Sequence, residues 1–537
     1  MMRKLAATAV AAGEPTRAPA QQRRIAEGIF KPAWDSLRQY KTPDWFRDAE
    51  FGIWAHWTAQ CVPEQGDWYA RQMYIQGTPH NKYHVQHYGH PSKFGFMEID
   101  NLWKAERWEP EALISRYVRA GAKYFVSLAN HHDNFDCYDS SHHAWNSVRV
   151  GPKKDIVGPW ARIARAHGLR FGVSNHSAHA WHWFQTAYGY DPEGDMAGVP
   201  YDGFTTKESG KGKWWEGLDP QQLYTGPNMV MPKGIASIQA AQQWHNQHDR
   251  IWTEEPPANN PQFVETWFLR CQELIDKYQP DLLYFDNTEL PLGQAGLDIA
   301  AHFYNSSIKR HGGLDAVLNS KGLKPEHTGT MVLDIERGCA DHILPTPWQT
   351  DTCIGEWHYR RSLYEQHRYK TVPQVIQTLV DIVSKNGNLL LSIPLRGDGS
   401  IDEDESLFLD GLASWMPVNG EAIFGTQPFT VFGEGAPDVR GTGNFNEGRG
   451  RAYTARDIRF TTKGDILYAT ALAWPDDGRL TIETLAQGRT EYPQPIRTVE
   501  LLGNAGPLSF SRESNGLVLT LPKVKPNEYA YVFKIRS

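Results

Sequence analysis

The sequence contains few cysteines, and no two of them are close together. Five cysteines occur among 537 residues, at positions 61, 137, 271, 339 and 353. Because there is no CxxC pair, a zinc knuckle and a thioredoxin-type redox site are both excluded. We expect most of these side chains to be buried thiols, with one or two disulfides as the alternative.

Long hydrophobic runs are also missing. No segment approaches the roughly 18 consecutive apolar residues that suggest a membrane span, so we expect none. Residues 1–12 combine Arg3 and Lys4 with a short Ala-rich run, which has the outline of a secretory signal peptide. We therefore expect a secreted or periplasmic protein, with a leader and N-terminal segment over residues 1–40.

Clusters of basic residues and nucleotide-binding motifs are absent as well. The formal net charge is −7, and no run of Lys and Arg is long enough to follow a phosphate backbone. We expect no nucleic-acid partner. No GxGxxG or P-loop spacing opens a helix, which excludes the common nucleotide-binding folds, and no cofactor is expected.

Aromatic residues, in contrast, are abundant. The chain has 20 Trp and 23 Tyr. Their rings can stack on the apolar faces of sugars while their polar tips stay hydrogen-bonded, so their number suggests a carbohydrate ligand. A large hydrophobic core, for which the 40% hydrophobic content is ample, would explain the same composition.

From about residue 41 to residue 425, short apolar runs alternate with longer helical stretches. Strands are expected at 51–56, 124–129, 169–174, 282–286, 316–319, 331–335 and 388–393. Helices are expected between them, for example at 110–120, 157–167, 264–278 and 375–384. This repeat predicts an α/β protein with a (β/α)8-like barrel, irregular or decorated in form. Residues 188–259, rich in Gly, Pro, Asp and Trp, are expected to be a long insertion that shapes one face.

The pattern changes after residue 425. Short runs, mostly alternating between apolar and polar residues, occur at 430–432, 466–472, 480–484, 498–502, 517–521 and 529–535. Gly, Pro and Asp separate them. This pattern is typical of an antiparallel β-sandwich, so we expect a C-terminal domain of this type over residues 426–537.

The most informative segment is 281–287, with the sequence DLLYFDN. An apolar run that ends in a carboxylate predicts a buried parallel strand with Asp286 at its carboxyl end, where barrels carry their chemistry. The other polar residues that follow predicted strands fall at the same end: His56, His131, His132, Asp133, His176, Asn319 and Glu336. We expect these side chains to form one active site.

Residues 131–133, with the sequence HHD, could also suggest a metal site. Adjacent residues on an extended stretch point in opposite directions, so we expect one site to use only one of the two histidines. No HExxH or His-x-His pair accompanies them. We therefore expect no metal.

Several segments together resemble a known family. They are FGIWAHW at 51–57, WYARQMY at 68–74, AGAKY at 120–124, HHDNF at 131–135, GLRFGV at 168–173, NGNLLL at 386–391 and VNGEAI at 418–423. In this order, across about 45 to 425, the chain resembles the α-L-fucosidases of glycoside hydrolase family 29.

The resemblance implies a retaining exo-glycosidase that releases terminal α-L-fucose from a fucosylated oligosaccharide or glycoconjugate. It places the nucleophile, which forms the glycosyl-enzyme, on Asp286. A second carboxyl group would act as acid and then as base. The resemblance and the aromatic residues around the sequence motifs give these sugar-binding candidates: His56, Trp57, Trp68, Tyr69, His131, His132 and Trp357.

The chain departs from the family at the acid/base. Many members carry a glutamate directly after a tryptophan beyond the nucleophile, but here the pair is Trp348 and Gln349. A glutamine cannot exchange a proton at neutral pH. Glu336, in the sequence DIERG, is the first candidate for the role, and Glu356 is the second. Another residue is the remaining alternative.

Two other functions are consistent with the same residues. An α-L-galactosidase would differ only in tolerating a hydroxyl group at carbon six of the sugar. A catalytically silent fucose-binding protein would explain Gln349, although it would have no need of Asp286. Release of fucose distinguishes an enzyme from a binder.

Overall fold

The computed structural model describes residues 23–436 and 441–537. The expected leader lies outside these residues, as does most of the segment before residue 40. The described chain begins with an extended stretch and two short helices, α1 (Trp34–Leu37) and α2 (Asp44–Arg47). Arg23 ties this stretch to the barrel through ion pairs with Glu265 and Asp298, both at 2.9 Å.

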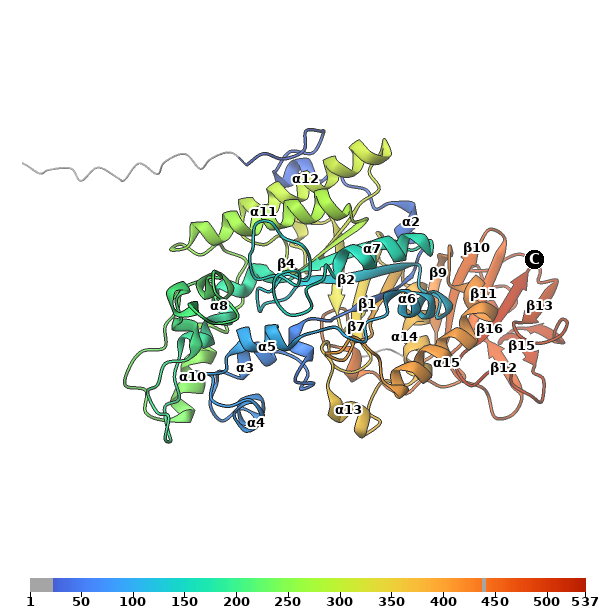
Figure 1. Ribbon diagram of the computed structural model, residues 1–537. Coiled ribbons are helices and arrows are strands. Elements are labelled where there is room, and N and C mark those ends of the chain that lie inside the picture. The colour runs from blue at the N-terminus through green and yellow to red at the C-terminus, as the bar shows by residue number, and fades with distance from the viewer. Residues whose placement is uncertain (1–22, 437–440) are drawn as a thin grey trace, which may run out of the picture.

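Eight parallel strands form a closed barrel, which confirms the predicted fold class. They are β1 (Phe51–Ala55), β2 (Tyr124–Asn130), β3 (Arg170–Asn175), β4 (Leu282–Thr288), β5 (Val317–Lys321), β6 (Val332–Glu336), β7 (Trp348–Cys353) and β8 (Gly387–Ser392). Each strand pairs with the next along the chain, and β8 closes on β1. Figure 1 shows the helices packed around this barrel, with the C-terminal domain at one side.

Seven of these strands are predicted from the sequence, and β7 is not. Its sequence, WQTDTC, is too polar to read as a buried strand, yet all six residues are buried. The polar side chains are satisfied inside the barrel. Gln349 accepts a hydrogen bond from the Tyr124 hydroxyl at 3.0 Å and donates one to Asp334 at 2.8 Å. Buried polar groups of this kind are stable only with such partners.

Six helices connect successive strands or follow the last one. They are α6 (Pro110–Arg119), α7 (Val157–Ala166), α11 (Pro261–Tyr278), α12 (Gln294–His311), α14 (Val372–Ser384) and α15 (Glu403–Asn419). In α6 one apolar face is buried, with Leu113, Ile114 and Tyr117, whereas α12 is buried over the consecutive residues 298–305. Between β5 and β7 the described elements are only a 3₁₀ turn, η6 (Pro325–His327), and β6. The barrel is therefore irregular on this side.

Seven further helices of the described chain lie in the segments that follow the carboxyl ends of β1, β3 and β7. They are α3 (Tyr69–Gln72), α4 (Pro79–His87), α5 (Phe96–Leu102), α8 (Ala180–Trp183), α9 (Pro220–Leu223), α10 (Ile238–His248) and α13 (Arg361–Glu365). Two of them, α9 and α10, belong to the insertion at 188–259. The insertion lies between β3 and β4, and in Figure 1 its green chain extends away from the C-terminal domain. Its buried anchor is an ion pair of 2.6 Å between Arg71 of α3 and Asp249.

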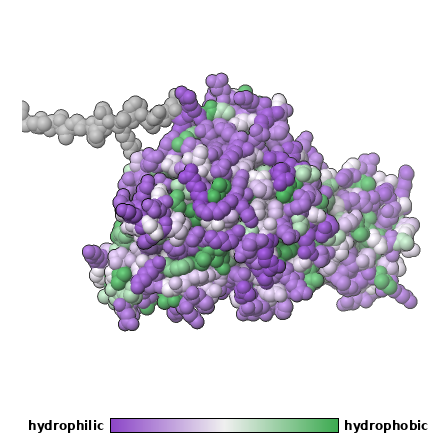
Figure 2. All heavy atoms as spheres, viewed as in Figure 1, coloured by the Kyte–Doolittle hydropathy of each residue, from purple (hydrophilic) through white to green (hydrophobic). Residues whose placement is uncertain are grey.

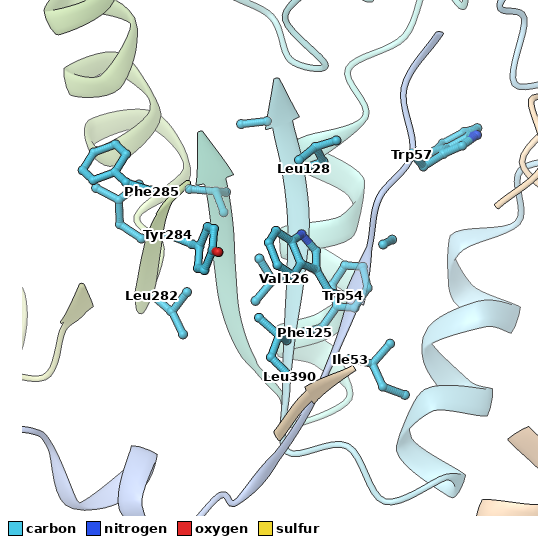
Figure 3. Packing of buried hydrophobic residues seen from close by; sticks show 14 of the residues in the cluster. Ile53, Trp54, Trp57, Phe125, Val126, Leu128, Leu282, Tyr284, Phe285 and Leu390 are labelled. Atoms are coloured by element: carbon cyan, nitrogen blue, oxygen red, sulfur yellow. The ribbon is translucent and has the colours of Figure 1, made fainter. Parts of the chain in front are cut away.

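The barrel interior is filled by large side chains from successive strands. In Figure 3 the neighbours Tyr284 and Phe285 of β4 point to opposite sides, as the strand period requires. Tyr284 meets Trp54 of β1 with ring centroids 4.7 Å apart, whereas Phe285 packs outward on Trp267 of α11 at 5.6 Å. A core of this kind closes the barrel below its carboxyl end.

The C-terminal domain consists of two antiparallel sheets, as predicted. The first, in the order β13-β16-β11-β10-β9, contains β9 (Gln427–Glu434), β10 (Ile458–Lys463), β11 (Ile466–Ala471), β13 (Thr498–Leu501) and β16 (Tyr531–Arg536). The second contains β12 (Arg479–Ile482), β14 (Phe510–Glu513) and β15 (Gly516–Thr520). Their inner faces share one hydrophobic core. Strands β10 and β14 are not predicted from the sequence, because they are rich in charged and hydroxyl side chains.

A buried charge cluster joins the two domains. Asp381 of α14 accepts hydrogen bonds from Arg459 of β10 at 2.6 Å and from Lys385 at 2.8 Å. The two cations hold the pKa of Asp381 below its usual value although burial alone would raise it. The C-terminal domain is therefore fixed to the barrel by specific contacts.

The outer surface is mostly hydrophilic, with small and separated hydrophobic patches on the face seen in Figure 2. Among residues 23–436 and 441–537, none of the helices has both the length and the apolar character needed to cross a membrane.

Candidate active site

A cavity of about 330 Å³ opens at the carboxyl end of the barrel. Its wall includes residues in or after seven of the eight barrel strands, β1 to β7. The lining residues are Trp54, His56, Trp68, His131, His132, His176, Trp252, Tyr284, Asp286, Thr288, Lys321, Glu336, Asp351, Trp357, Asn444 and Phe445. The predicted site residues at the strand ends are thus largely brought together, as a parallel barrel requires.

Asp286 lies near the centre of this wall, and its side chain is 14% exposed. It contacts the Lys321 ammonium, the Nε2 atom of His132 at 3.1 Å and the Nδ1 atom of His176 at 3.3 Å. Burial would raise its pKa, but the charge of Lys321 and the hydrogen bonds from both histidines hold the pKa well below the usual value. Asp286 is therefore an ionised carboxylate.

Lys321, at the end of β5, joins two carboxyl groups. Its Nζ atom contacts Asp286 and also Glu336 Oε2, the latter at 2.6 Å. Since one ammonium touches both groups, their nearest oxygens are separated by at most two hydrogen-bond lengths, about 5.5 Å. The two carboxyl groups therefore face the same small volume of the cavity.

Glu336 has the opposite titration behaviour to Asp286. Burial is the main cause that raises its pKa to about 7, and repulsion by Asp351 and Asp286 adds to it, while Lys321 acts against it. Close to neutral pH, one carboxyl group of the pair is ionised and the other carries a proton for much of the time. Such a divergence within one cavity is what acid and base roles require.

A second pair of carboxyl groups lies beneath Glu336. Burial raises the pKa of Asp351 well above its usual value and that of Asp334 to about 6, and the two side chains are hydrogen-bonded to each other. The Tyr284 hydroxyl donates to Asp351 at 2.8 Å, and the Gln349 amide donates to Asp334 at 2.8 Å. Gln349 thus belongs to the polar interior of the barrel and does not line the cavity.

Aromatic and imidazole rings form the opposite side of the cavity. The His56 ring lies 3.9 Å from that of Trp54 and 4.9 Å from that of Trp357, measured between centroids. Burial lowers the pKa of both His56 and His131 well below the usual value, so both rings are neutral. Neutral imidazoles beside flat aromatic faces can bind hydroxyl groups and the apolar face of a sugar.

The two adjacent histidines, 131 and 132, do not point in opposite directions, and this expectation was wrong. They follow the end of β2 and lie in a turn in which Asn134 has φ 63°, so the alternation of a strand no longer applies. Both rings line the cavity, with centroids 4.4 Å apart.

Ring nitrogens of His131, His132 and His176 lie within 4.8 Å of one another, which would suit a transition metal by donor type. They already have other contacts, however. His131 Nδ1 meets the Gln60 amide at 2.9 Å, and His132 Nδ1 meets the His176 carbonyl at 2.8 Å. His132 Nε2 and His176 Nδ1 also contact Asp286 Oδ2, at 3.1 Å and 3.3 Å, so two of the three rings are engaged by this carboxylate.

Five residues expected at the site do not line the cavity: Asp133 and Asn319, which are both fully buried, and Trp57, Tyr69 and Glu356. Trp57 points away from the barrel interior in Figure 3, and its indole donates to the Arg396 carbonyl at 2.8 Å. Tyr69 is buried with its hydroxyl on His84 at 2.8 Å. Trp57 directly follows His56, and Tyr69 directly follows Trp68. His56 and Trp68 do line the cavity, and the neighbouring side chain points in another direction in both cases. Glu356 contacts Arg360 at 2.5 Å and accepts from the Asp67 backbone at 3.1 Å.

Several lining residues were not found from the sequence. Lys321 comes only two residues after Asn319, so extending the predicted strand would have found it. Asp351 was hidden because β7 itself was missed. Trp252 comes from the insertion, and Asn444 and Phe445 come from the C-terminal domain. Nothing in the local sequence places these three at the barrel.

Comparison with known proteins agrees with this architecture. The profile of the α-L-fucosidase family matches residues 18–421, and that of the α-L-fucosidase C-terminal domain matches residues 452–536. Tissue α-L-fucosidase of Rattus norvegicus is 25% identical over 524 residues, which are 95% of this chain and 93% of that protein. Plasma α-L-fucosidase of Homo sapiens is 26% identical over 508 residues, 92% and 89% of the two chains.

Among solved structures, Thermotoga maritima α-fucosidase in complex with a mechanism-based inhibitor is similar, with a TM-score of 0.67 and 25% identity. The alignment covers 95% of this chain and 100% of that one. The first profile alone covers most of the sequence, and it spans the segments that carry the resemblance except for the last two residues of 418–423. The chain therefore belongs to the α-L-fucosidase family, and it is a glycoside hydrolase.

Proposed function

We propose that this enzyme releases terminal α-L-fucose with net retention, using Asp286 as nucleophile and Glu336 as acid/base. The observation that carries the proposal is the Lys321 bridge between two carboxyl groups with opposite pKa shifts. Retaining glycosidases hold their two carboxyl groups about 5–5.5 Å apart, which the bridge fits. An inverting enzyme needs a wider gap that admits water between sugar and base.

In the first step, a carboxylate oxygen of Asp286 attacks the anomeric carbon of fucose. The bond from that carbon to the glycosidic oxygen breaks, and Glu336 transfers its proton to the departing oxygen. The depressed pKa of Asp286 keeps the nucleophile charged, while the pKa of about 7 keeps Glu336 protonated. The product is a fucosyl ester on Asp286.

In the second step, Glu336 is a carboxylate and removes a proton from water. The water oxygen attacks the anomeric carbon, and the ester bond to Asp286 breaks. The negative charge is on Asp286 before the first step and on Glu336 before the second step. Because Lys321 contacts both groups, it can pair with the charged group at each stage. We infer that Lys321 balances the single negative charge of the pair at both stages.

The remaining lining residues suit recognition of the sugar. The Trp54 and Trp357 rings give an apolar surface for the methyl side of fucose, and the neutral rings of His56 and His131 face the same cavity as hydroxyl-binding groups. A cavity of about 330 Å³ accommodates one monosaccharide, which favours removal of terminal residues.

The test is release of fucose by the purified protein from an aryl α-L-fucoside and from fucosylated oligosaccharides of each linkage, with an aryl α-L-galactoside in parallel. Proton NMR of the first turnovers should show the α-anomer of the product. Asp286→Ala should abolish turnover. Glu336→Ala should lose far more activity on oligosaccharides than on aryl fucosides with good leaving groups, and added azide should restore turnover of the latter.

Glu356→Gln serves as the matched carboxyl control, because Glu356 lies outside the cavity wall. It should retain most of the activity. A β-anomer as first product would reject the retaining mechanism. Fucose binding without release from any substrate would support a silent binder instead.

A further inference from the structure

A loop of the C-terminal domain reaches the cavity of the barrel. Between β9 and β10, Asn444 and Phe445 form part of the cavity wall. Phe445 is 60% exposed, an uncommon position for a large hydrophobic side chain, and its backbone has φ 55°. A non-glycine residue in this conformation costs free energy and persists only where its surroundings hold it.

The surroundings of Phe445 are the backbone of Glu336. The Phe445 amide donates to the Glu336 carbonyl at 2.8 Å. The Glu336 amide in turn donates to Asn444 Oδ1 at 2.9 Å. The backbone of Phe445 is therefore tied to that of the proposed acid/base, although more than 100 residues separate them in the sequence.

The same loop is anchored on both sides of this contact. Before it, the Gly443 amide bonds the Cys339 carbonyl at 3.3 Å. After it, the Glu447 carboxylate bonds Arg337 and Lys370, both at 2.9 Å, and accepts from Thr352 at 2.8 Å. Burial would raise the pKa of Glu447, but Lys370 and the other donors lower it. Residues 443–447 are thus held against the barrel at both ends.

We propose that Phe445 forms the subsite for the sugar to which fucose is attached, and that it is a determinant of leaving-group specificity. This inference rests on the proposed function. The acid must hydrogen-bond the glycosidic oxygen, so the leaving group lies on the Glu336 side of the fucose. Phe445 is fixed on that side and exposes its ring to the cavity.

The chemistry of the ring indicates the ligand. A phenylalanine offers an apolar face and no hydrogen-bonding tip, which suits the C–H face of a hexopyranose. Asn444 is the polar neighbour, but its Oδ1 atom is engaged by Glu336. The subsite should therefore recognise the presence of a pyranose ring more strongly than the pattern of its hydroxyl groups.

The experiment compares two substrates for the full-length enzyme: α-L-fucosyl fluoride, whose leaving group is a single atom, and a fucosylated oligosaccharide. We expect Phe445→Ala to lower kcat/KM for the oligosaccharide about tenfold, mainly through KM, because a stacked ring contributes about one order of magnitude. Its kcat/KM for the fluoride should stay within about twofold of the original value. Since the ring is exposed, its removal leaves no core cavity.

Two further variants act as controls. Phe445→Tyr keeps the aromatic face and should restore activity on the oligosaccharide. Phe204→Ala removes a phenylalanine that is 42% exposed on the insertion and does not line the cavity, so it should change neither substrate. The pH profile of Phe445→Ala should match that of the original enzyme, because Glu336 is not displaced.

Three results would overturn the inference. Unchanged activity of Phe445→Ala on the oligosaccharide would mean that the ring does not touch the substrate. An equal loss on both substrates, or a shifted basic limb of the pH profile, would mean that the loop only positions Glu336. If the original enzyme hydrolyses neither substrate, the proposed function fails and this inference fails with it. The first two results leave the proposed function intact.

Discussion

At the scale of single residues, the contacts of Lys321 determine how charge is distributed over the site. One ammonium faces Asp286, whose pKa is depressed, and Glu336, whose pKa is raised to about 7. A buried cation between two carboxyl groups allows one of them to remain ionised at low cost. A neutral side chain of similar length at position 321 would lose the ionic contacts with both carboxyl groups.

Replacing Lys321 with methionine should therefore raise the pKa of Asp286 and lower kcat/KM. A hydrogen bond to a charged group is worth about 1.5–3 kcal/mol, which corresponds to a loss of roughly 10- to 100-fold. Steady-state kinetics on an aryl fucoside across pH measures both effects. Lys324→Met is the matched control, since Lys324 is 62% exposed and pairs with Glu289 outside the cavity. Equal activity of the two variants would contradict this role of Lys321.

The pH dependence follows from the same pair. Glu336 must be protonated for the first step, so kcat/KM should fall as pH rises above about 7. Asp286 must be ionised, and its pKa lies well below the usual value, so the acidic limb should appear only at low pH. A profile of kcat/KM on an aryl fucoside tests both limbs. In Glu336→Gln the basic limb should disappear; if it persists, another group is the acid.

At the scale of secondary structure, the loop with Trp252 is fixed to the strand of the nucleophile. Glu254 accepts from the Thr288 amide of β4 at 2.8 Å and also contacts Asn287 and His179. The Trp252 ring lies over His179, with centroids 3.7 Å apart, and lines the cavity. One carboxylate thus couples the long insertion to the end of β4.

Glu254→Ala should release this loop without disturbing the barrel. We expect KM for an aryl fucoside to rise several-fold, with a smaller change in kcat, because Trp252 loses its fixed position. Trypsin cleavage after the exposed Arg250, followed by mass spectrometry, should become faster. Glu255→Ala, at an exposed neighbouring carboxylate, provides the comparison. Unaltered KM and cleavage in Glu254→Ala would show that other contacts hold the loop.

At the scale of the whole molecule, the C-terminal domain is both a packing partner and a part of the cavity wall. Its position depends on the buried contact between Arg459 and Asp381, both of which are at most 5% exposed. The loop with Phe445 depends on that position. Stability of the interface and selectivity for the leaving group are therefore linked.

Arg459→Ala should destabilise the protein by about 3 kcal/mol, because it removes one charged partner from a carboxylate that stays buried. Thermal unfolding followed by calorimetry measures the loss. Selectivity for the oligosaccharide over fucosyl fluoride should fall in the same variant, because the loop is less well held. Arg456→Ala, at an exposed position of the same domain, should change neither quantity. A stable Arg459→Ala protein would show that other contacts between the domains, such as those of Glu447, are enough to fix the domain.

The barrel, the sandwich and the end of the barrel that carries the site can all be predicted from the amino-acid sequence. Apolar periodicity is a local property, and the carboxyl ends of parallel strands necessarily meet, so the strand pattern is enough to group Asp286, His132 and Glu336. The family motifs indicate the chemistry for the same reason, since they surround these strand ends.

The remaining features of the site depend on the tertiary structure. Lys321 contacts both carboxyl groups because β4, β5 and β6 are adjacent, and Gln349 is buried because the polar interior of the barrel satisfies it. Phe445 and Trp252 reach the cavity from segments far away in the sequence, and Trp57 and Tyr69 turn away from it. Such contacts depend on packing between elements and on the directions of single side chains, which a local pattern does not encode.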